Sequence, residues 1–180
     1  MRTFNTPQPI SVTVEVGLGE LRIIASDRTD TTVDVRPSDP DKAGDVTAAE
    51  QTRIDFSSGH LEVKAPKGLK YYTFWGRSGS VDVTLEVPTG SAVRAESGAG
   101  PIRCTGRLGD SRFHSGAGDV HVEEAGACHV ASGAGQVVLD RAGGDAEVTT
   151  GTGLIRVGAV DGTLTIKNAN GDTWVGEVTG

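Results

Sequence analysis

The chain has 180 residues, a formal net charge of −7, 26 glycines and 4% aromatic residues. This length is enough for one domain with a substantial core, and the glycine excess suits many tight corners around a small aliphatic interior. The acidic balance argues against nucleic-acid binding, which needs a basic stripe. No apolar run approaches the length of a membrane span.

The N-terminal half predicts short strands interrupted by two insertions. Alternating apolar residues, typical of half-buried strands, occupy 11–16, 32–35, 53–56 and 80–87, and a glycine corner followed by a strand occupies 17–23 and 58–63. Residues 37–50 are polar and contain Pro37, Pro40 and Gly44, so we predict an exposed inserted loop with a helical turn near Val46–Ala49. The second insertion covers residues 64–79.

A four-residue corner motif then recurs through the C-terminal half. Its copies begin at Ser97, Ser115, Ser132, Thr150 and Asn168, so their spacing is constant except that the second interval is one residue shorter. Such a short fixed period is typical of a solenoid, in which each repeat forms one coil. After each corner comes an alternating pair: Ile102/Cys104, Val120/Val122, Val137/Leu139, Ile155/Val157 and Thr173/Val175.

A second glycine column divides each coil into two strands. It comprises Gly109, Gly126, Gly144 and Gly162, and each glycine precedes another alternating pair. These tight corners favour glycine because they need positive φ or a close backbone approach. We therefore predict an all-β fold, a β-solenoid of about 18-residue coils, each with two short strands and two glycine corners, and an irregular N-terminal half.

The domain organisation predicted is one β-solenoid domain over residues 1–180, because no interdomain linker is visible. Continuing the second glycine column by one more period reaches Gly180. Solenoids need capped ends to stay monomeric, so we expect that the C-terminus is truncated or uncapped. Unpaired strand edges can pair with another chain, so we expect self-association through the C-terminal edge. Because Met1–Pro7 lacks the apolar core of a signal peptide, we expect a cytoplasmic protein, with a surface location only if a leader is missing.

Catalytic and metal sites have little support in the sequence. The glycine corners lack the Gly-Lys-Ser/Thr ending of a phosphate loop, and carboxylates do not follow one another coil after coil as a calcium ladder requires. The four histidines are dispersed, with His121 and His129 on opposite faces of one coil. Cys104 and Cys128 fall on inward positions and predict buried free thiols, with a disulfide as the alternative. We therefore predict no enzyme activity, no catalytic residues, no cofactor and no metal site.

Two stretches are candidate interaction sites. The outward positions of the first strand form a column: Arg103, His121, Val138, Arg156 and Trp174. Successive members would lie one strand apart, and Arg156 below Trp174 would form a cation–π pair. The column predicts a contact face, and the alternative is ordinary cross-strand neighbours on a hydrated sheet.

The other stretch is an aromatic cluster in the second insertion, formed by Tyr71, Tyr72, Phe74 and Trp75 and followed by Arg77. Concentrated aromatics with arginine often make interfaces. The alternative is that the same side chains fold back and cap the irregular end of the solenoid. Nothing in the sequence favours one of these two interpretations.

The repeated Ser-Gly-Ala-Gly corners, the Gly-x-[Val/Ile/Leu]-x-[Val/Leu/Cys] strands and the opening segment Thr6–Gly17 carry a family resemblance. Over essentially the whole chain, the sequence resembles the actinobacterial branch of the β-strand-repeat "putative adhesin" family, a domain of unknown function. The resemblance implies a β-solenoid without known catalytic or metal residues.

The function predicted is therefore a non-catalytic scaffold or interaction module that binds a protein or a cell-envelope component. The alternative is a structural protein that assembles end to end, as cytoplasmic bactofilin-like solenoids do. A polysaccharide hydrolase would need long loops that form a cleft with paired carboxylates. Only residues 37–50 are acidic enough, and they have no facing partner.

Overall fold

The computed structural model describes residues 1–66 and 79–180, which form strands and one short helix. The elements are β1 (Arg2–Asn5), β2 (Ser11–Leu18), β3 (Leu21–Ser26), β4 (Asp30–Pro37), α1 (Ala43–Gln51), β5 (Arg53–Ser57), β6 (His60–Lys64), β7 (Val81–Pro88), β8 (Ala92–Ala99), β9 (Ile102–Arg107), β10 (Ser111–Ala117), β11 (Val120–Ala125), β12 (Cys128–Ala134), β13 (Val137–Ala142), β14 (Ala146–Thr152), β15 (Ile155–Val160), β16 (Leu164–Asn170) and β17 (Thr173–Val178).

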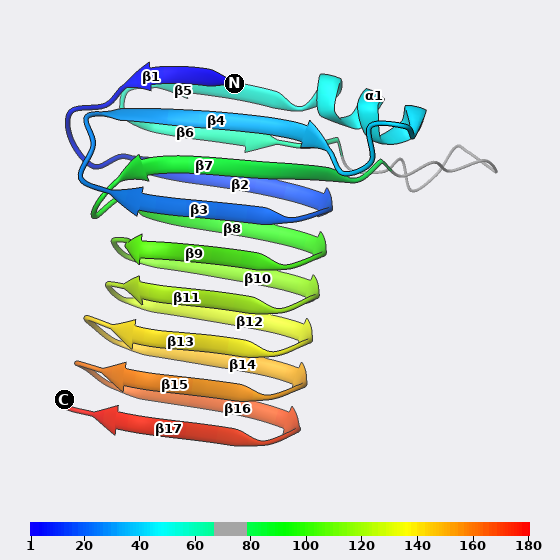
Figure 1. The fold of residues 1–180 in the computed structure, drawn as a ribbon. Coiled ribbons are helices and arrows are strands. Elements are labelled where there is room, and N and C mark those ends of the chain that lie inside the picture. The colour runs from blue at the N-terminus through cyan, green and yellow to red at the C-terminus, as the bar shows by residue number, and fades with distance from the viewer. Residues whose placement is uncertain (67–78) are drawn as a thin grey trace.

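These strands form two large sheets that lie face to face (Figure 1). Sheet A has nine strands in the order β1-β4-β7-β3-β9-β11-β13-β15-β17, and sheet B has eight in the order β16-β14-β12-β10-β8-β2-β6-β5. Both sheets are mixed and open, because β4 pairs antiparallel with β1 and β7, and β5 pairs antiparallel with β6. From β8 to β17 the chain alternates between the sheets, and every neighbour pair is parallel.

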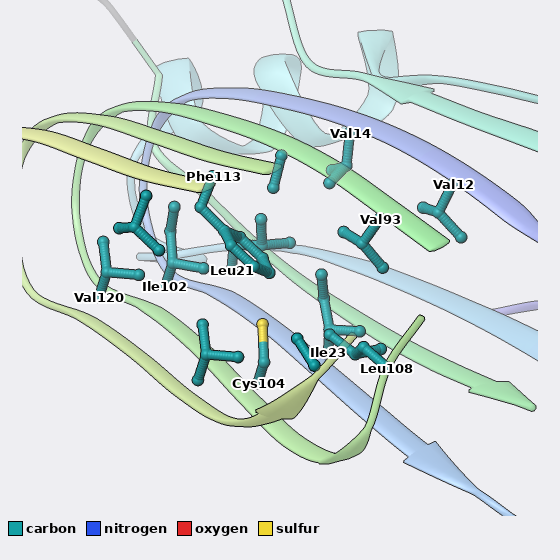
Figure 2. Close-up of a cluster of buried hydrophobic side chains, with 14 of the residues drawn as sticks. Val12, Val14, Leu21, Ile23, Val93, Ile102, Cys104, Leu108, Phe113 and Val120 are labelled. Atoms are coloured by element: carbon teal, nitrogen blue, oxygen red, sulfur yellow. The ribbon is translucent and has the colours of Figure 1, made fainter. Parts of the chain in front are cut away.

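The predicted apolar files are present between the sheets. Ile102, Val120, Val137 and Ile155 are consecutive register partners in sheet A, and all are fully buried. Figure 2 shows side chains from both sheets meeting: Phe113 from sheet B lies beside Leu21 from sheet A, and Val93 from sheet B points toward Ile23 from sheet A. A single pair of facing strands would leave its inward apolar side chains exposed above and below. These side chains are buried only because the neighbouring strands of both sheets cover them.

A column of glycines at positive φ makes the first corner of the repeated coils. Gly118 has φ +136°, and a Cβ there would overlap the carbonyl oxygen of Gly100. The corresponding relationship recurs at Gly135, Gly153 and Gly171, each stacked on the glycine one coil before. The second corner needs glycine for another reason. A Cβ on Gly109 would lie 2.5 Å from the carbonyl oxygen of Gly90 without any positive φ at Gly109.

The difference between the first two intervals of the corner motif has a local structural cause. Between β9 and β11 the register shifts at Val122/Glu124, so β9 holds one extra residue. Gly106 lies in this bulge at φ +80°, and its N–H donates to Glu123 Oε2 at 2.9 Å. A bulge absorbs one residue without turning the following side chains over to the wrong face. Coils of slightly different length therefore stack in the same register.

The N-terminal half is built out of sequence order. The pair β2–β3 lies between β6–β7 on one side and β8–β9 on the other, because β2 pairs with β6 and β8 and β3 pairs with β7 and β9. The strands predicted at 11–16, 32–35, 53–56, 58–63 and 80–87 are all present. Their order in space differs from a plain continuation of the coils along the chain.

The first insertion differs from the predicted exposed loop. It contains α1 (Ala43–Gln51), a nine-residue helix in which Asp45 and Ala48 are buried. Asp45 accepts backbone N–H groups from Ser80, at 2.8 Å, and from Asp39, at 3.1 Å. These bonds tie the helix to the segment that enters β7. The helix is longer than the single turn expected at Val46–Ala49, because tertiary contacts stabilise a segment with little amphipathic pattern of its own.

The corner motif places a polar file inside the apolar layer. Its members are register partners in sheet B: Ser97, Ser115, Ser132, Thr150 and Asn168. The first four are buried, and a side-chain oxygen of each of the five has no hydrogen-bond partner among the described residues. Stacked strands lie about 4.8 Å apart, which is too far for one hydroxyl to bond the next.

Candidate functional site

Parallel pairing aligns outward-facing side chains on sheet A in a single column. Arg103, His121, Val138, Arg156 and Trp174 are consecutive register partners in β9, β11, β13, β15 and β17. Arg22 of β3 extends the column beyond Arg103. The residues of the predicted contact face therefore share one side of the molecule. We call these six residues the arginine–tryptophan column.

Contacts within this column fix several of its side chains. Arg156 Cζ lies 5.1 Å from the ring centroid of Trp174, so the predicted cation–π pair is present. His121 Nε2 lies 2.9 Å from Asp140 Oδ2. Arg22 and Arg103 approach the same oxygen, Glu20 Oε1, at 3.2 Å and 3.9 Å.

The chemistry of the column is basic and aromatic. It has three arginines and no acidic member, and the carboxylates of Glu20 and Asp140 flank it. Trp174 is 51% exposed, which is unusual for a large apolar ring. A hollow of ≈280 Å³ opens between Arg103 and His121 and reaches Val138. The arrangement offers guanidinium donors and one apolar ring to a partner that lies flat on the sheet.

The outer face of sheet B carries a larger hollow, which the sequence analysis did not single out. Its volume is ≈630 Å³, and it runs across strands β2, β8, β10, β12, β14 and β16. Arg94 and Arg112 line it and are register partners. The signal was available in the sequence, because these arginines are separated by one full period of the corner motif.

The aromatic cluster cannot be placed on either face. Tyr71, Tyr72, Phe74, Trp75 and Arg77 all lie in residues 67–78, outside the described residues. The alternatives of an exposed interface and a packed cap therefore both stay predictions.

The structure brings no catalytic or metal constellation together within residues 1–66 and 79–180. No group of three His, Cys, Asp or Glu side chains there could hold a metal ion. His121 and His129 lie in strands of different sheets, as predicted. In the described part of the chain, no hydroxyl or thiol is hydrogen-bonded to the His121–Asp140 pair.

The two cysteines are buried free thiols, as the sequence predicts. Burial raises the pKa of Cys128 to about 12. The pKa of Cys104 is raised further, by burial first and then by the neighbouring Cys128. Since the thiolate is the reactive form, neither residue is suited to nucleophilic or redox chemistry.

Among the described residues, no helix has the length and apolar character needed to cross a membrane.

Comparison with known proteins gives likenesses of structure alone. The chain matches no protein-family model and no curated protein sequence. It is similar to a putative cell adhesion protein from Clostridium sporogenes, with 11% identity and a TM-score of 0.39 over 99% of this chain and 96% of that one. A putative adhesin from Bacteroides fragilis shows 13% identity and a TM-score of 0.37 over 96% and 94%. A putative lipid binding protein from Parabacteroides distasonis shows 10% identity and a TM-score of 0.26 over 96% and 95%. Likeness at this level carries no argument about function.

Proposed function

We propose that this chain is a non-catalytic binding scaffold, a β-solenoid domain over residues 1–180 that holds a protein or a cell-envelope component against sheet A. The observation that carries the proposal is the register of the arginine–tryptophan column. Parallel pairing sets its side chains about 4.8 Å apart on a rigid face, and Trp174 stays half exposed at one end.

A binding role fits the contacts better than a reaction does. Exposed tryptophan and arginine are the side chains that most often dominate protein interfaces. The cation–π pair holds the Trp174 ring in place before any partner arrives, so less side-chain entropy is lost on binding. By contrast, both side chains of the acid–base pair His121–Asp140 are half exposed to water, so a reaction there would have no enclosed site.

The test is capture of partners by the natural full-length protein and by the double variant Arg103→Ala/Trp174→Ala. We expect proteins or envelope fractions retained by the wild type to be lost from this variant. The matched control is Arg36→Ala/Arg141→Ala, which removes exposed residues of β4 and β13 outside the column. Identical capture by the wild type and Arg103→Ala/Trp174→Ala would refute the assignment of the face.

A second candidate function is end-to-end assembly of the bactofilin-like kind. The observation that favours it is the state of the outer strands: among the described strands, β16 and β17 each have one neighbour, and Val175 and Val178 of β17 are 39% and 44% exposed. A second copy, or further coils of a longer chain, would pair with the same edges. Light scattering over a concentration series of the natural full-length protein tests this candidate, and a persistent monomer rejects it.

A further inference from the structure

The hollow on the outer face of sheet B, which we call the groove, is lined by side chains of several neighbouring strands. Its lining includes Ser11, Thr13, Arg94, Arg112, His129 and Glu147, contributed by β2, β8, β10, β12 and β14. One side carries the long side chains of Arg94, Arg112 and His129. The other follows positions with small side chains, such as Ser11 and Ala92, where the surface is hollowed. The groove therefore runs across the strands, from coil to coil.

Two arginines face the groove without an acidic partner. Arg94 of β8 and Arg112 of β10 are direct register partners, so their guanidinium groups extend from neighbouring strands. Like charges directly opposite one another on a sheet destabilise it. Neither arginine forms an ion pair with any carboxylate in residues 1–66 and 79–180, whereas several other arginines of those segments do.

The carboxylates of the groove are already engaged elsewhere. Asp110 Oδ1 accepts the N–H of Ala127 at 2.9 Å, and Asp145 Oδ1 accepts the N–H of Thr163 at 2.8 Å. Glu147 lies 3.3 Å from His129 Nδ1 and 3.7 Å from Lys167 Nζ. Asp110 and Asp145 keep their negative charge, and the cations of the groove without an acidic partner are the two guanidinium forks of Arg94 and Arg112, with hydroxyls beside them. Such forks match the geometry of a carboxylate.

We propose that this groove binds an acidic polysaccharide, a chain of sugars that carry carboxylates. The arginines would pair with the carboxylates, and the Ser and Thr hydroxyls would bond sugar hydroxyls. A polymer is favoured because the groove continues past the arginine pair over several coils. The site lies on the opposite sheet from the arginine–tryptophan column, so it does not depend on the function proposed for that face.

Other polyanions and acidic peptides fit the groove less well. Single-stranded nucleic acid binds through extended aromatic stacking platforms, and no Phe, Tyr or Trp side chain of the described residues lines this groove. An extended peptide pairs with a free strand edge, and β2, β8, β10, β12 and β14 each have neighbours on both sides.

The test is calorimetric titration of the natural full-length protein with oligogalacturonate at low salt. We expect binding that weakens as salt rises and that falls at least about tenfold in Arg94→Gln/Arg112→Gln, since two charge-assisted contacts are lost. The variant Arg36→Gln/Arg141→Gln removes the same charge from exposed positions on sheet A. It should bind as the wild type does.

Three results would overturn the proposal. The first is no binding of oligogalacturonate at millimolar concentration, and the second is equal binding by Arg94→Gln/Arg112→Gln. The third is that either of two control probes binds as tightly as oligogalacturonate does. One is methyl-esterified oligogalacturonate, which lacks the negative charge, and the other is oligodeoxythymidylate, which lacks the sugar carboxylates. Thermal unfolding monitors the fold of each variant, and a rise in melting temperature with oligogalacturonate should occur in the wild type and the control variant alone. Partner capture by sheet A is a separate experiment, so a negative result for the groove does not affect the test of the arginine–tryptophan column, and the reverse also holds.

Discussion

Arg28 and Glu86 join two parts of the chain that are distant in sequence. Arg28 Nη1 lies 2.7 Å from Glu86 Oε2, and Arg28 Nε lies 2.8 Å from Asp30 Oδ1. Thr32 Oγ1 donates to the same Glu86 oxygen at 2.8 Å. The cluster lies where β4 runs antiparallel beside β7, and it therefore ties the irregular N-terminal strands to the parallel stack.

Stability should fall in acid through Glu86. Hydrogen bonds from Arg28 first, and from Thr32 second, hold the pKa of Glu86 below its ordinary value. A lowered native pKa gives stability that is present above the unfolded pKa, about 4.3, and is lost as pH falls through the native pKa. We expect Glu86→Gln to cost about 0.5–1 kcal/mol at pH 7, since the carboxylate is partly exposed. The difference from the wild type should shrink in urea denaturation at pH 3.5, and an unchanged difference would contradict the assignment.

Gly118→Ala should disrupt the stack. The new Cβ would require an unfavourable positive φ and would overlap the carbonyl oxygen of Gly100 in the coil before. We expect a loss of about 3 kcal/mol or more in the free energy of unfolding. The control is Gly143→Ala, whose Cβ would lie 3.7 Å from the nearest atom, the carbonyl oxygen of Ala125. That change should stay within about 0.5 kcal/mol, and equal losses at both positions would argue against this explanation.

The buried hydroxyl of Ser115 should contribute nothing to stability. Its Oγ has no partner among the described residues, and the residue is fully buried. The change to alanine replaces this unpaired buried hydroxyl by hydrogen, which removes the desolvation cost of the hydroxyl. We expect Ser115→Ala to leave the free energy of unfolding unchanged or to raise it by up to about 1 kcal/mol.

Ser91→Ala is the matched control for that prediction. Ser91 is equally buried, but its Oγ donates to the carbonyl of Pro88 at 2.7 Å and accepts the N–H of Ile10 at 3.1 Å. Its loss should cost about 1–3 kcal/mol, because the N–H of Ile10 is left unpaired. A loss above about 1 kcal/mol in Ser115→Ala would show that its hydroxyl is satisfied after all.

The thiols of Cys104 and Cys128 should be inert in the folded protein. Both are buried, and burial raises the pKa of each. Because reaction requires the thiolate, raising the pH from 7 to 9 should not make either thiol reactive toward a disulfide reagent. In urea, two thiols per chain should react at once. Rapid reaction of the native protein at pH 8 would show that a coil opens locally.

The repeated half of the fold was predictable because its signals are local and periodic. Ile102 and Val137 were placed in one buried file from the alternation after each corner, and the register confirms this. The same period placed Arg156 beside Trp174. Side-chain alternation and a fixed coil length determine which residues share a face, so these relations need no knowledge of distant pairing.

The N-terminal half was less predictable because its pairing is long-range. Alternation marks Val12, Val33 and Val81 as inward residues of strands, but it does not say which strand lies beside which. The antiparallel direction of β4 and the position of β2–β3 depend on contacts across the whole half. The predicted helical turn was shorter than helix α1. The reason is that the burial of α1 depends on Ser80 and Asp39, whose backbone N–H groups bond the carboxylate of Asp45.

The predictions of sites likewise succeeded where the signal is periodic in sequence and failed where it depends on three-dimensional contacts. The arginine–tryptophan column followed from the period, whereas the sheet B groove was missed. Its arginines were identifiable as one coil apart, but their lack of acidic partners is a property of three-dimensional contacts. Asp110 and Asp145 line the groove themselves, and each accepts a backbone N–H of the following coil.

The placement of β2–β3 sets an order of events during synthesis. These two strands leave the ribosome early, yet the partner of Ser11 on one side is Ala92, which is made only when about half of the chain has been synthesised. Until β8 and β9 have emerged, each strand of this early pair keeps one edge bare, a state in which a nascent chain is open to wrong pairing and to chaperones. The later coils, by contrast, each add onto a finished neighbour. The N-terminal half therefore bears most of the risk of misfolding, and its completion is the step on which growth of the rest depends.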